Sequence, residues 1–136
     1  MGHLAVSTKH PVVAVIDDDI SILNATRRLL STHGFDTELY DCPDTFLDAV
    51  TTTQAICLLV DIQLGQRCGI QFVRQLAKRG ITFPVIFITA NDKDEIELRA
   101  REAGCVAFFR KPFSAYLLIE ALNDLPNSYA VIRPRE

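Results

Sequence analysis

Four apolar runs of the sequence each end in side chains that could take part in phosphoryl chemistry. In chain order, these side chains are Asp17, Asp18, Asp19, Asp61, Thr89 and Lys111. Carboxylates without histidine or cysteine partners are the ligands that Mg²⁺ prefers, because it is a hard cation. A hydroxyl and an ammonium group can contact the oxygens of a phosphoryl group. One such residue alone would be explained by a strand end that reaches water, but the joint pattern predicts metal-assisted phosphoryl chemistry.

The apolar runs that precede these residues have the length and composition of β-strands. Short runs of this kind, rich in β-branched residues, are typical of strands buried on both faces of a sheet. Buried strands are predicted over 12–16, 55–60, 84–88 and 106–109. Apolar and polar residues alternate over 35–40, which predicts a half-exposed strand at an edge.

Amphipathic stretches separate the strands and predict helices. They cover about 20–33, 43–50, 70–77, 91–103 and 114–125. Asn91 or Asp92 is the predicted cap of the fourth helix, and Ser114 that of the fifth. The segment 62–69 is predicted to be a polar loop. Strict alternation of five strands and five helices predicts an α/β fold, a doubly wound, five-stranded parallel (βα)₅ sheet with helices on both faces.

The predicted fold brings the strand-end residues together. The carboxyl ends of parallel strands lie along one edge of a sheet, where ligands bind in folds of this class. We therefore expect the aspartates to converge there with Thr89 and Lys111. Carboxylates held close together repel one another, and a divalent cation relieves that repulsion. The sequence therefore predicts a Mg²⁺ site beside a hydroxyl and an ammonium group.

The composition limits the class of protein. The 136 residues, 49% hydrophobic and 23% charged, suffice for one domain with a well-filled core. We predict this domain over 11–125, with an N-terminal extension over 1–10 and a C-terminal tail over 126–136. The formal net charge of −3 argues against a nucleic-acid binder. No apolar run is long enough to cross a membrane, and with no secretory signal visible the expected location is the cytoplasm.

Four motifs stand at the predicted strand ends. They are Asp17-Asp18, Asp61 followed eight residues later by Gly69, Thr89-Ala90, and Lys111-Pro112-Phe113. Together they resemble the response regulator receiver domain of two-component signal transduction, and the segment 84–89 is most similar to the FixJ-type subgroup. The resemblance covers about Pro11 to Leu125. It implies a flavodoxin-like sheet with strand order 2-1-3-4-5.

The resemblance assigns roles around a phosphate acceptor. Asp61 matches the aspartate that accepts the phosphoryl group in a Mg²⁺-dependent reaction. Asp17 and Asp18 match the acidic pair that holds Mg²⁺ together with Asp61, and the backbone carbonyl of Gln63 is a further ligand. Lys111 matches the lysine that pairs with the phosphoryl group.

The resemblance also implies a conformational switch. Thr89 matches the hydroxyl that turns toward the phosphoryl group, and Phe108 occupies the switch aromatic position. The bond between Lys111 and the proline that follows it is cis in the family. Phosphorylation then changes the surface formed by the fourth helix, the fifth strand and the fifth helix. The expected protein is a signalling switch rather than an enzyme of repeated turnover.

The implied partner is a sensor histidine kinase or a histidine phosphotransfer domain. Phosphorylation-dependent homodimerisation is a further hypothesis, because Tyr116 and Ile119 lie off the predicted core stripe of the last helix. We expect either a stand-alone regulator or a fragment of a transcription regulator. The chain itself is expected to contact neither nucleic acid nor membrane.

Two features of the sequence depart from this assignment. Leu64-Gly65 stands where the family usually has Met-Pro, and the loss of proline is expected to free the backbone near the metal site. The segment 17–21, Asp-Asp-Asp-Ile-Ser, also fits the opening motif of haloacid-dehalogenase-type phosphatases. In that alternative Asp17 is the nucleophile and Asp19 the acid/base, and Asp61 has no role. The further acidic motif that those phosphatases need is not found on a predicted strand after Lys111.

Overall fold

The strands of the computed structural model, which describes residues 10–125, form one five-stranded sheet. They are β1 (Val12–Ile16), β2 (Asp36–Tyr40), β3 (Ala55–Asp61), β6 (Val85–Thr89) and β7 (Ala107–Arg110). All neighbouring strands pair in parallel, in the order β2-β1-β3-β6-β7. This order confirms the predicted doubly wound sheet. Apart from His10, the predicted extension and tail lie outside the described residues.

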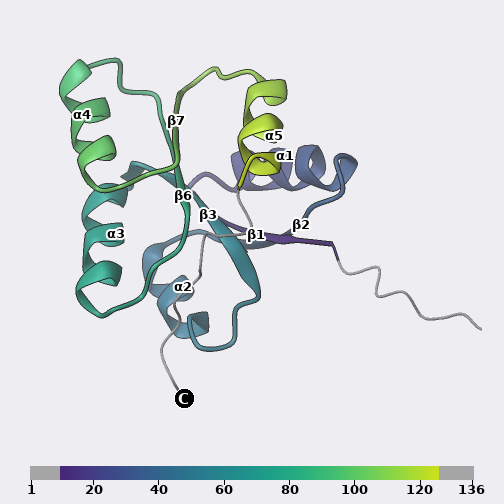
Figure 1. Cartoon of the computed structure of the whole chain (residues 1–136), viewed down its shortest axis with the longest axis horizontal. Helices are drawn as coiled ribbons and strands as arrows, with labels where there is room; N and C mark the ends of the chain where they lie inside the picture. The colour runs from purple at the N-terminus through teal and green to yellow at the C-terminus, as the bar shows by residue number, and fades with distance from the viewer. Residues whose placement is uncertain (1–9, 126–136) are drawn as a thin grey trace, which may run out of the picture.

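Five helices cover the two faces of this sheet (Figure 1). On one face lie α1 (Ile20–Thr32) and α5 (Ala115–Asn123); on the other lie α2 (Pro43–Ala49), α3 (Gly69–Lys78) and α4 (Asp94–Glu102). Successive residues of a strand point to opposite faces, so each buried strand supplies both cores. In β1, Val13 and Val15 belong to the core beside α1 and α5, whereas Ala14 and Ile16 belong to the other core.

An aromatic cluster fixes the helices of the second core. The fully buried ring of Phe46 makes edge-to-face contacts with Tyr40, Phe72 and Phe83 at centroid distances of 5.3, 5.9 and 5.8 Å. This is the favoured geometry for aromatic pairs, because the positive edge of one ring faces the negative face of another. The cluster joins β2, α2, α3 and the segment before β6.

The structure corrects the prediction for the last strand. Residues 106–109 were expected to form a strand buried on both faces, but β7 is the second edge of the sheet and all its residues are half-buried. The guanidinium carbon of Arg110, the last residue of β7, lies 5.1 Å from the centre of the Phe108 ring on the same strand. The strand order implied by the resemblance, 2-1-3-4-5, is confirmed and places this strand at the edge, so only the burial inferred from the apolar run was too high.

Two local predictions are also wrong. The fourth helix begins after Lys93 rather than after Asn91 or Asp92, because the Asn91 side chain accepts the Lys93 N–H at 2.9 Å and forms a turn before the helix. The predicted polar loop over 62–69 contains an antiparallel hairpin, β4 (Gln63–Leu64) and β5 (Arg67–Cys68). The side chain of Leu64 is buried there.

Other local expectations are confirmed. The Ser114 hydroxyl caps α5 by accepting the Leu117 N–H at 3.3 Å, and the bond between Lys111 and Pro112 is cis. Within the described chain, no helix has both the length and the apolar character needed to span a bilayer.

Candidate functional site

The candidate site is built around Asp61, the last residue of β3. The residue is 7% exposed, and hydrogen-bond donors hold its carboxylate on both sides. One oxygen accepts the Gln63 N–H at 2.9 Å, and the other accepts a hydrogen bond from the Lys111 ammonium group at 3.0 Å. Because two donors fix the carboxylate at the open edge of the sheet, Asp61 is oriented before any ligand binds.

Two more carboxylates complete an acidic cluster. One oxygen each of Asp17, Asp18 and Asp61 lies within 4.8 Å of the others. The Asp17 side chain accepts the Asp19 N–H at 2.9 Å, and the exposed Asp18 accepts the Gly65 N–H at 2.9 Å. Carboxylate oxygens at this separation suit a hard divalent cation, so the donor set fits the predicted Mg²⁺. The exposure of Asp18 leaves a side of the cluster open to ligands.

Burial controls the electrostatics of Asp17. It raises the pKa of Asp17 from 3.8 to about 6, against the effect of the backbone hydrogen bond from Asp19. The charge of Asp61 raises this pKa further, and Lys111 lowers it. The cluster thus holds two buried carboxylates whose mutual repulsion is only partly relieved by the Lys111 ammonium group, which favours the binding of a further cation.

Lys111 is the cation that faces both buried carboxylates. Its ammonium group lies 3.0 Å from Asp61 and 3.5 Å from Asp17. Burial alone would lower the pKa of Lys111, but the hydrogen bond and charge of Asp61, together with the charge of Asp17, outweigh this effect and raise it. Lys111 therefore stays protonated and is available to neutralise a negatively charged ligand at Asp61.

The two residues predicted to form the switch lie on neighbouring strands, Thr89 on β6 and Phe108 on β7. Thr89 is fully buried at the end of β6, and its hydroxyl accepts the Asn91 N–H at 3.0 Å. The Thr89 carbonyl accepts the Lys111 N–H at 2.7 Å, which ties the two strand ends together. Phe108 is half-buried on β7 and packs against the core beside α2, α3 and α4.

The structure brings together most of the residues predicted from the sequence. Asp17, Asp18, Asp61 and Lys111 converge at one edge, as expected. Asp19 does not join them, because its carboxylate accepts hydrogen bonds from the Ser21 N–H at 2.9 Å and the Ser21 hydroxyl at 2.6 Å and caps α1.

Three residues contribute to the site through contacts that the sequence did not predict. Gly65 orients Asp18 through its N–H. Gly69 is packed so closely that a Cβ atom there would lie 2.5 Å from the Asp61 carbonyl oxygen. Arg110 precedes Lys111 and contacts the loop after Thr89. Gly69 had a sequence signal in its fixed spacing from Asp61, and Gly65 stood out as a departure from the family pattern, but Arg110 had none because its contacts depend on the fold.

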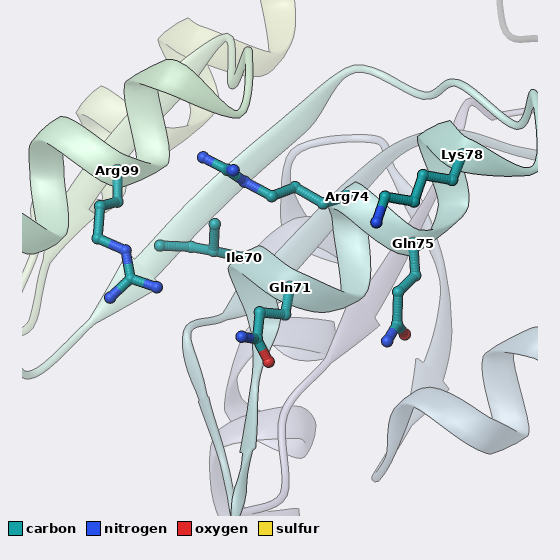
Figure 2. A pocket seen from close by; sticks show the side chains of 6 residues that line it. All are labelled: Ile70, Gln71, Arg74, Gln75, Lys78 and Arg99. Atoms are coloured by element: carbon teal, nitrogen blue, oxygen red, sulfur yellow. The ribbon is translucent and has the colours of Figure 1, made fainter.

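A separate groove between α3 and α4 takes no part in this site (Figure 2). Arg74 and Lys78 of α3 and Arg99 of α4 line it, together with Ile70 at the start of α3. None of the strand-end residues lines this groove. The acidic cluster and the basic groove are therefore distinct surfaces.

Comparison with known proteins agrees with this geometry. Residues 13–123 match the family model described as the response regulator receiver domain. The response regulator protein TodT of Pseudomonas putida is 31% identical over 117 residues, which are 86% of this chain and 52% of TodT. The transcriptional regulatory protein FixJ of Bradyrhizobium diazoefficiens is 29% identical over 101 residues, or 74% of this chain and 49% of FixJ.

A solved structure of a response regulator receiver protein is also similar to this chain. The response regulator receiver protein from Burkholderia phymatum is 40% identical, with a TM-score of 0.72 over 82% of this chain and 91% of that chain. This chain spans about half the length of the curated relatives it matches. None of these matches favours a phosphatase. The family model matches most of the chain, the sheet has the order that the resemblance implied, and an acidic cluster lies at its edge. The chain therefore belongs to the response regulator receiver domain family of two-component signalling.

Proposed function

We propose that Asp61 is the phosphate acceptor of this receiver and that a sensor histidine kinase or a histidine phosphotransfer domain supplies the phosphoryl group. The observation that supports the proposal is that two donors orient the Asp61 carboxylate, which accepts hydrogen bonds from the Gln63 N–H and the Lys111 ammonium group. An Asp61 oxygen attacks phosphorus, the P–N bond of the phosphohistidine breaks, and the donor leaves as imidazole. The product is an acyl phosphate on Asp61.

Asp17, Asp18 and Asp61 would hold Mg²⁺ together with the backbone carbonyl of Gln63. Bound Mg²⁺ would neutralise the phosphoryl oxygens during transfer. Lys111 pairs with Asp61 at 3.0 Å and would contact a phosphoryl oxygen after transfer. The protein otherwise only positions the reacting groups, so the expected activity is a switch without repeated turnover.

A groove beside Lys111 suits the helix of a phosphate donor. It is lined mainly by apolar groups of α1, namely Ile22, Ala25 and Leu29, and by Pro112 and Phe113 after β7. An apolar groove next to a reactive group can bind an amphipathic helix and bring its histidine near Asp61. We propose that the kinase or phosphotransfer domain docks here.

The output surface consists of α4, β7 and α5, which we call the α4–β7–α5 surface. When the buried Thr89 hydroxyl turns toward the phosphoryl group, the space that it leaves can be filled by Phe108, which changes this surface. We propose a protein partner in the cytoplasm for it, because the net charge of −3 does not suit nucleic acid. A DNA-binding part elsewhere in the protein would agree with the name of the relative FixJ.

Binding of beryllofluoride, which mimics an aspartyl phosphate, tests this proposal. Fluorine NMR of the wild-type chain is expected to show bound fluoride resonances only when Mg²⁺ is present. Asp61→Asn should abolish them, whereas Asp41→Asn, at an exposed carboxylate outside the cluster, should leave them unchanged. Equal binding by Asp61→Asn would show that the acceptor is another residue.

A further inference from the structure

Arg110, the last residue of β7, binds the segment that links the switch threonine to α4. Its guanidinium group donates to the Asn91 carbonyl at 3.4 Å and to the Lys93 carbonyl at 3.2 Å. It also pairs with the Glu97 carboxylate at 3.1 Å, and its carbon lies 5.1 Å from the centre of the Phe108 ring. One side chain therefore holds the loop, the helix and the switch aromatic residue together.

This loop is directly connected to the Thr89 hydroxyl. The Asn91 N–H donates to that hydroxyl at 3.0 Å, and the Asn91 carbonyl accepts from Arg110. The Asn91 side chain then accepts the Lys93 N–H at 2.9 Å, which fixes the positions of the two carbonyls relative to each other. The Thr89 hydroxyl cannot move far unless it gives up the Asn91 N–H or takes the loop with it.

We propose that Arg110 is a latch that stabilises the unphosphorylated arrangement of the 90–93 loop and Phe108. The inference rests on the proposed function, because it needs a signal at Asp61 that moves Thr89. A planar guanidinium group makes several hydrogen bonds in one fixed geometry, so displacement of the loop breaks them together. Their loss removes the cation from the face of Phe108 and frees the ring to move.

The position of Arg110 links this latch to the output surface. Arg110, Phe108 and Glu97 line a groove that also reaches Leu117 of α5. A change in the Arg110 contacts therefore changes the floor of the groove between α4 and α5. The latch would make the output surface sensitive to the loop after Thr89 without direct contact between Asp61 and α4.

The sign of the effect follows from the state that Arg110 stabilises. A mimic that binds only the switched state has an apparent dissociation constant that is inversely proportional to the population of that state. Removing partly exposed, charge-assisted hydrogen bonds from the resting state should raise this population by a factor of about 3–10. The Arg110→Met variant should thus bind Mg²⁺-beryllofluoride about 3–10 times more tightly than wild type.

Arg101→Met is the matched control. Arg101 also pairs with Glu97, at 3.1 Å, but it lies on the exposed face of α4 and has no hydrogen bond to the 90–93 loop. Both variants replace an arginine that binds the same carboxylate by a side chain of similar length. The control should leave the affinity for the mimic at the wild-type value. Arg110→Lys keeps the charge but loses the planar set of N–H donors. Its affinity for the mimic should therefore lie between those of wild type and Arg110→Met.

The experiment compares mimic affinity and thermal midpoint in the two states. The latch predicts that Arg110→Met lowers the midpoint of the metal-free protein while leaving the beryllofluoride-bound midpoint unchanged. A purely structural role would lower both midpoints equally and leave the affinity unchanged, which would overturn the proposal, as would weaker binding. Failure of the wild-type chain to bind the mimic would instead overturn the proposed function itself.

Discussion

At the scale of single residues, the site depends on the charge of Asp17. This carboxylate is 4% exposed and lies beside a second buried carboxylate, with Lys111 as their shared cation. The pKa of Asp17 in the folded chain is about 6, above its ordinary value of 3.8. The folded state therefore binds a proton more tightly than the unfolded state, and ionisation of Asp17 costs stability as the pH rises through this range.

Asp17→Asn should therefore stabilise the metal-free protein at neutral pH. The gain in free energy of unfolding should be on the order of 1–2 kcal/mol at about pH 7.5 and should shrink toward zero at about pH 4, where wild-type Asp17 is protonated. Urea denaturation with a chelator at both pH values measures it. Asp41→Asn serves as the exposed control. A variant that is less stable than wild type at pH 7.5 would show that the Lys111 contact outweighs the cost of burial.

Gly65 is the second residue on which the acidic cluster depends. It has a φ angle of +63° between β4 and β5, and its N–H donates to Asp18. The expected loosening at Leu64-Gly65 is not what this backbone shows, because the hairpin supplies a turn and a hydrogen bond of its own. Glycine adopts this left-handed conformation without the strain that a side chain would cause.

Restoring the family's proline at this position should be harmful. Gly65→Pro removes the N–H donor and requires a φ angle near −65°, so it should cost about 3 kcal/mol and weaken Mg²⁺ binding. Gly65→Ala keeps the donor and should cost only about 1 kcal/mol. Denaturation and metal titration of both variants separate the two effects. A proline variant with wild-type stability would contradict this prediction, because it would mean that the β4–β5 hairpin adopts another backbone conformation at no cost in stability.

At the scale of elements, the junction between β3 and α3 positions Asp61. Gly69 begins α3, its N–H donates to the Ile62 carbonyl at 2.7 Å, and it lies against the end of β3. A Cβ atom there would lie 2.5 Å from the Asp61 carbonyl oxygen and 2.8 Å from a methyl group of Val60. The close approach of α3 to β3 therefore requires glycine at this position.

The same substitution at the two ends of α3 should have different costs. Gly69→Ala should destabilise the fold by about 2–4 kcal/mol and lower the rate of phosphorylation, because β3 must move. Gly80→Ala, beyond the other end of the helix, meets no neighbouring atom within 4 Å and should cost only about 1 kcal/mol. Chemical denaturation and acetyl phosphate kinetics provide the comparison. Equal costs for the two variants would contradict the proposed packing constraint.

Most elements could be predicted from the sequence because their signals are local. The run 12–16 became β1 without change, and the predicted cap Ser114 begins α5 as expected. The β4–β5 hairpin was missed because strands of two residues have no periodicity. The burial of β7 was overestimated because an apolar run has the same composition at an edge as at the centre, although the strand order implied by the resemblance placed it at the edge. Arg110 was missed because its contacts are with segments 13 to 19 residues away.

At the scale of the whole molecule, the structure changes which residues of the α4–β7–α5 surface support the dimer hypothesis. The dimer hypothesis was based on Tyr116 and Ile119, but Ile119 is only 8% exposed and belongs to the core. Tyr116 is 71% exposed on α5, and Leu98 is 61% exposed on α4. Exposed apolar side chains of this size indicate a contact surface. In the dimer hypothesis, Leu98 therefore replaces Ile119 as the partner of Tyr116.

Beryllofluoride with Mg²⁺ should convert the chain from monomer to dimer through this surface. Sedimentation velocity should show the shift for wild type and for Ile20→Ser, an equally exposed apolar residue on α1. The double variant Leu98→Ser, Tyr116→Ser should stay monomeric with the mimic, because it loses the apolar contact area. A wild-type chain that is monomeric in both conditions would reject dimerisation.

The central claim is that Asp61 carries the phosphoryl group, and peptide mass spectrometry after incubation with acetyl phosphate tests it most directly. We expect a single adduct on the peptide containing Asp61, dependent on Mg²⁺ and absent from Asp61→Asn. Asp41→Asn should be phosphorylated like wild type. This control would show that the adduct is lost in Asp61→Asn because of the position of Asp61 and not because one carboxylate has been removed. An adduct on Asp17 that persists in Asp61→Asn would contradict the account and revive the phosphatase alternative.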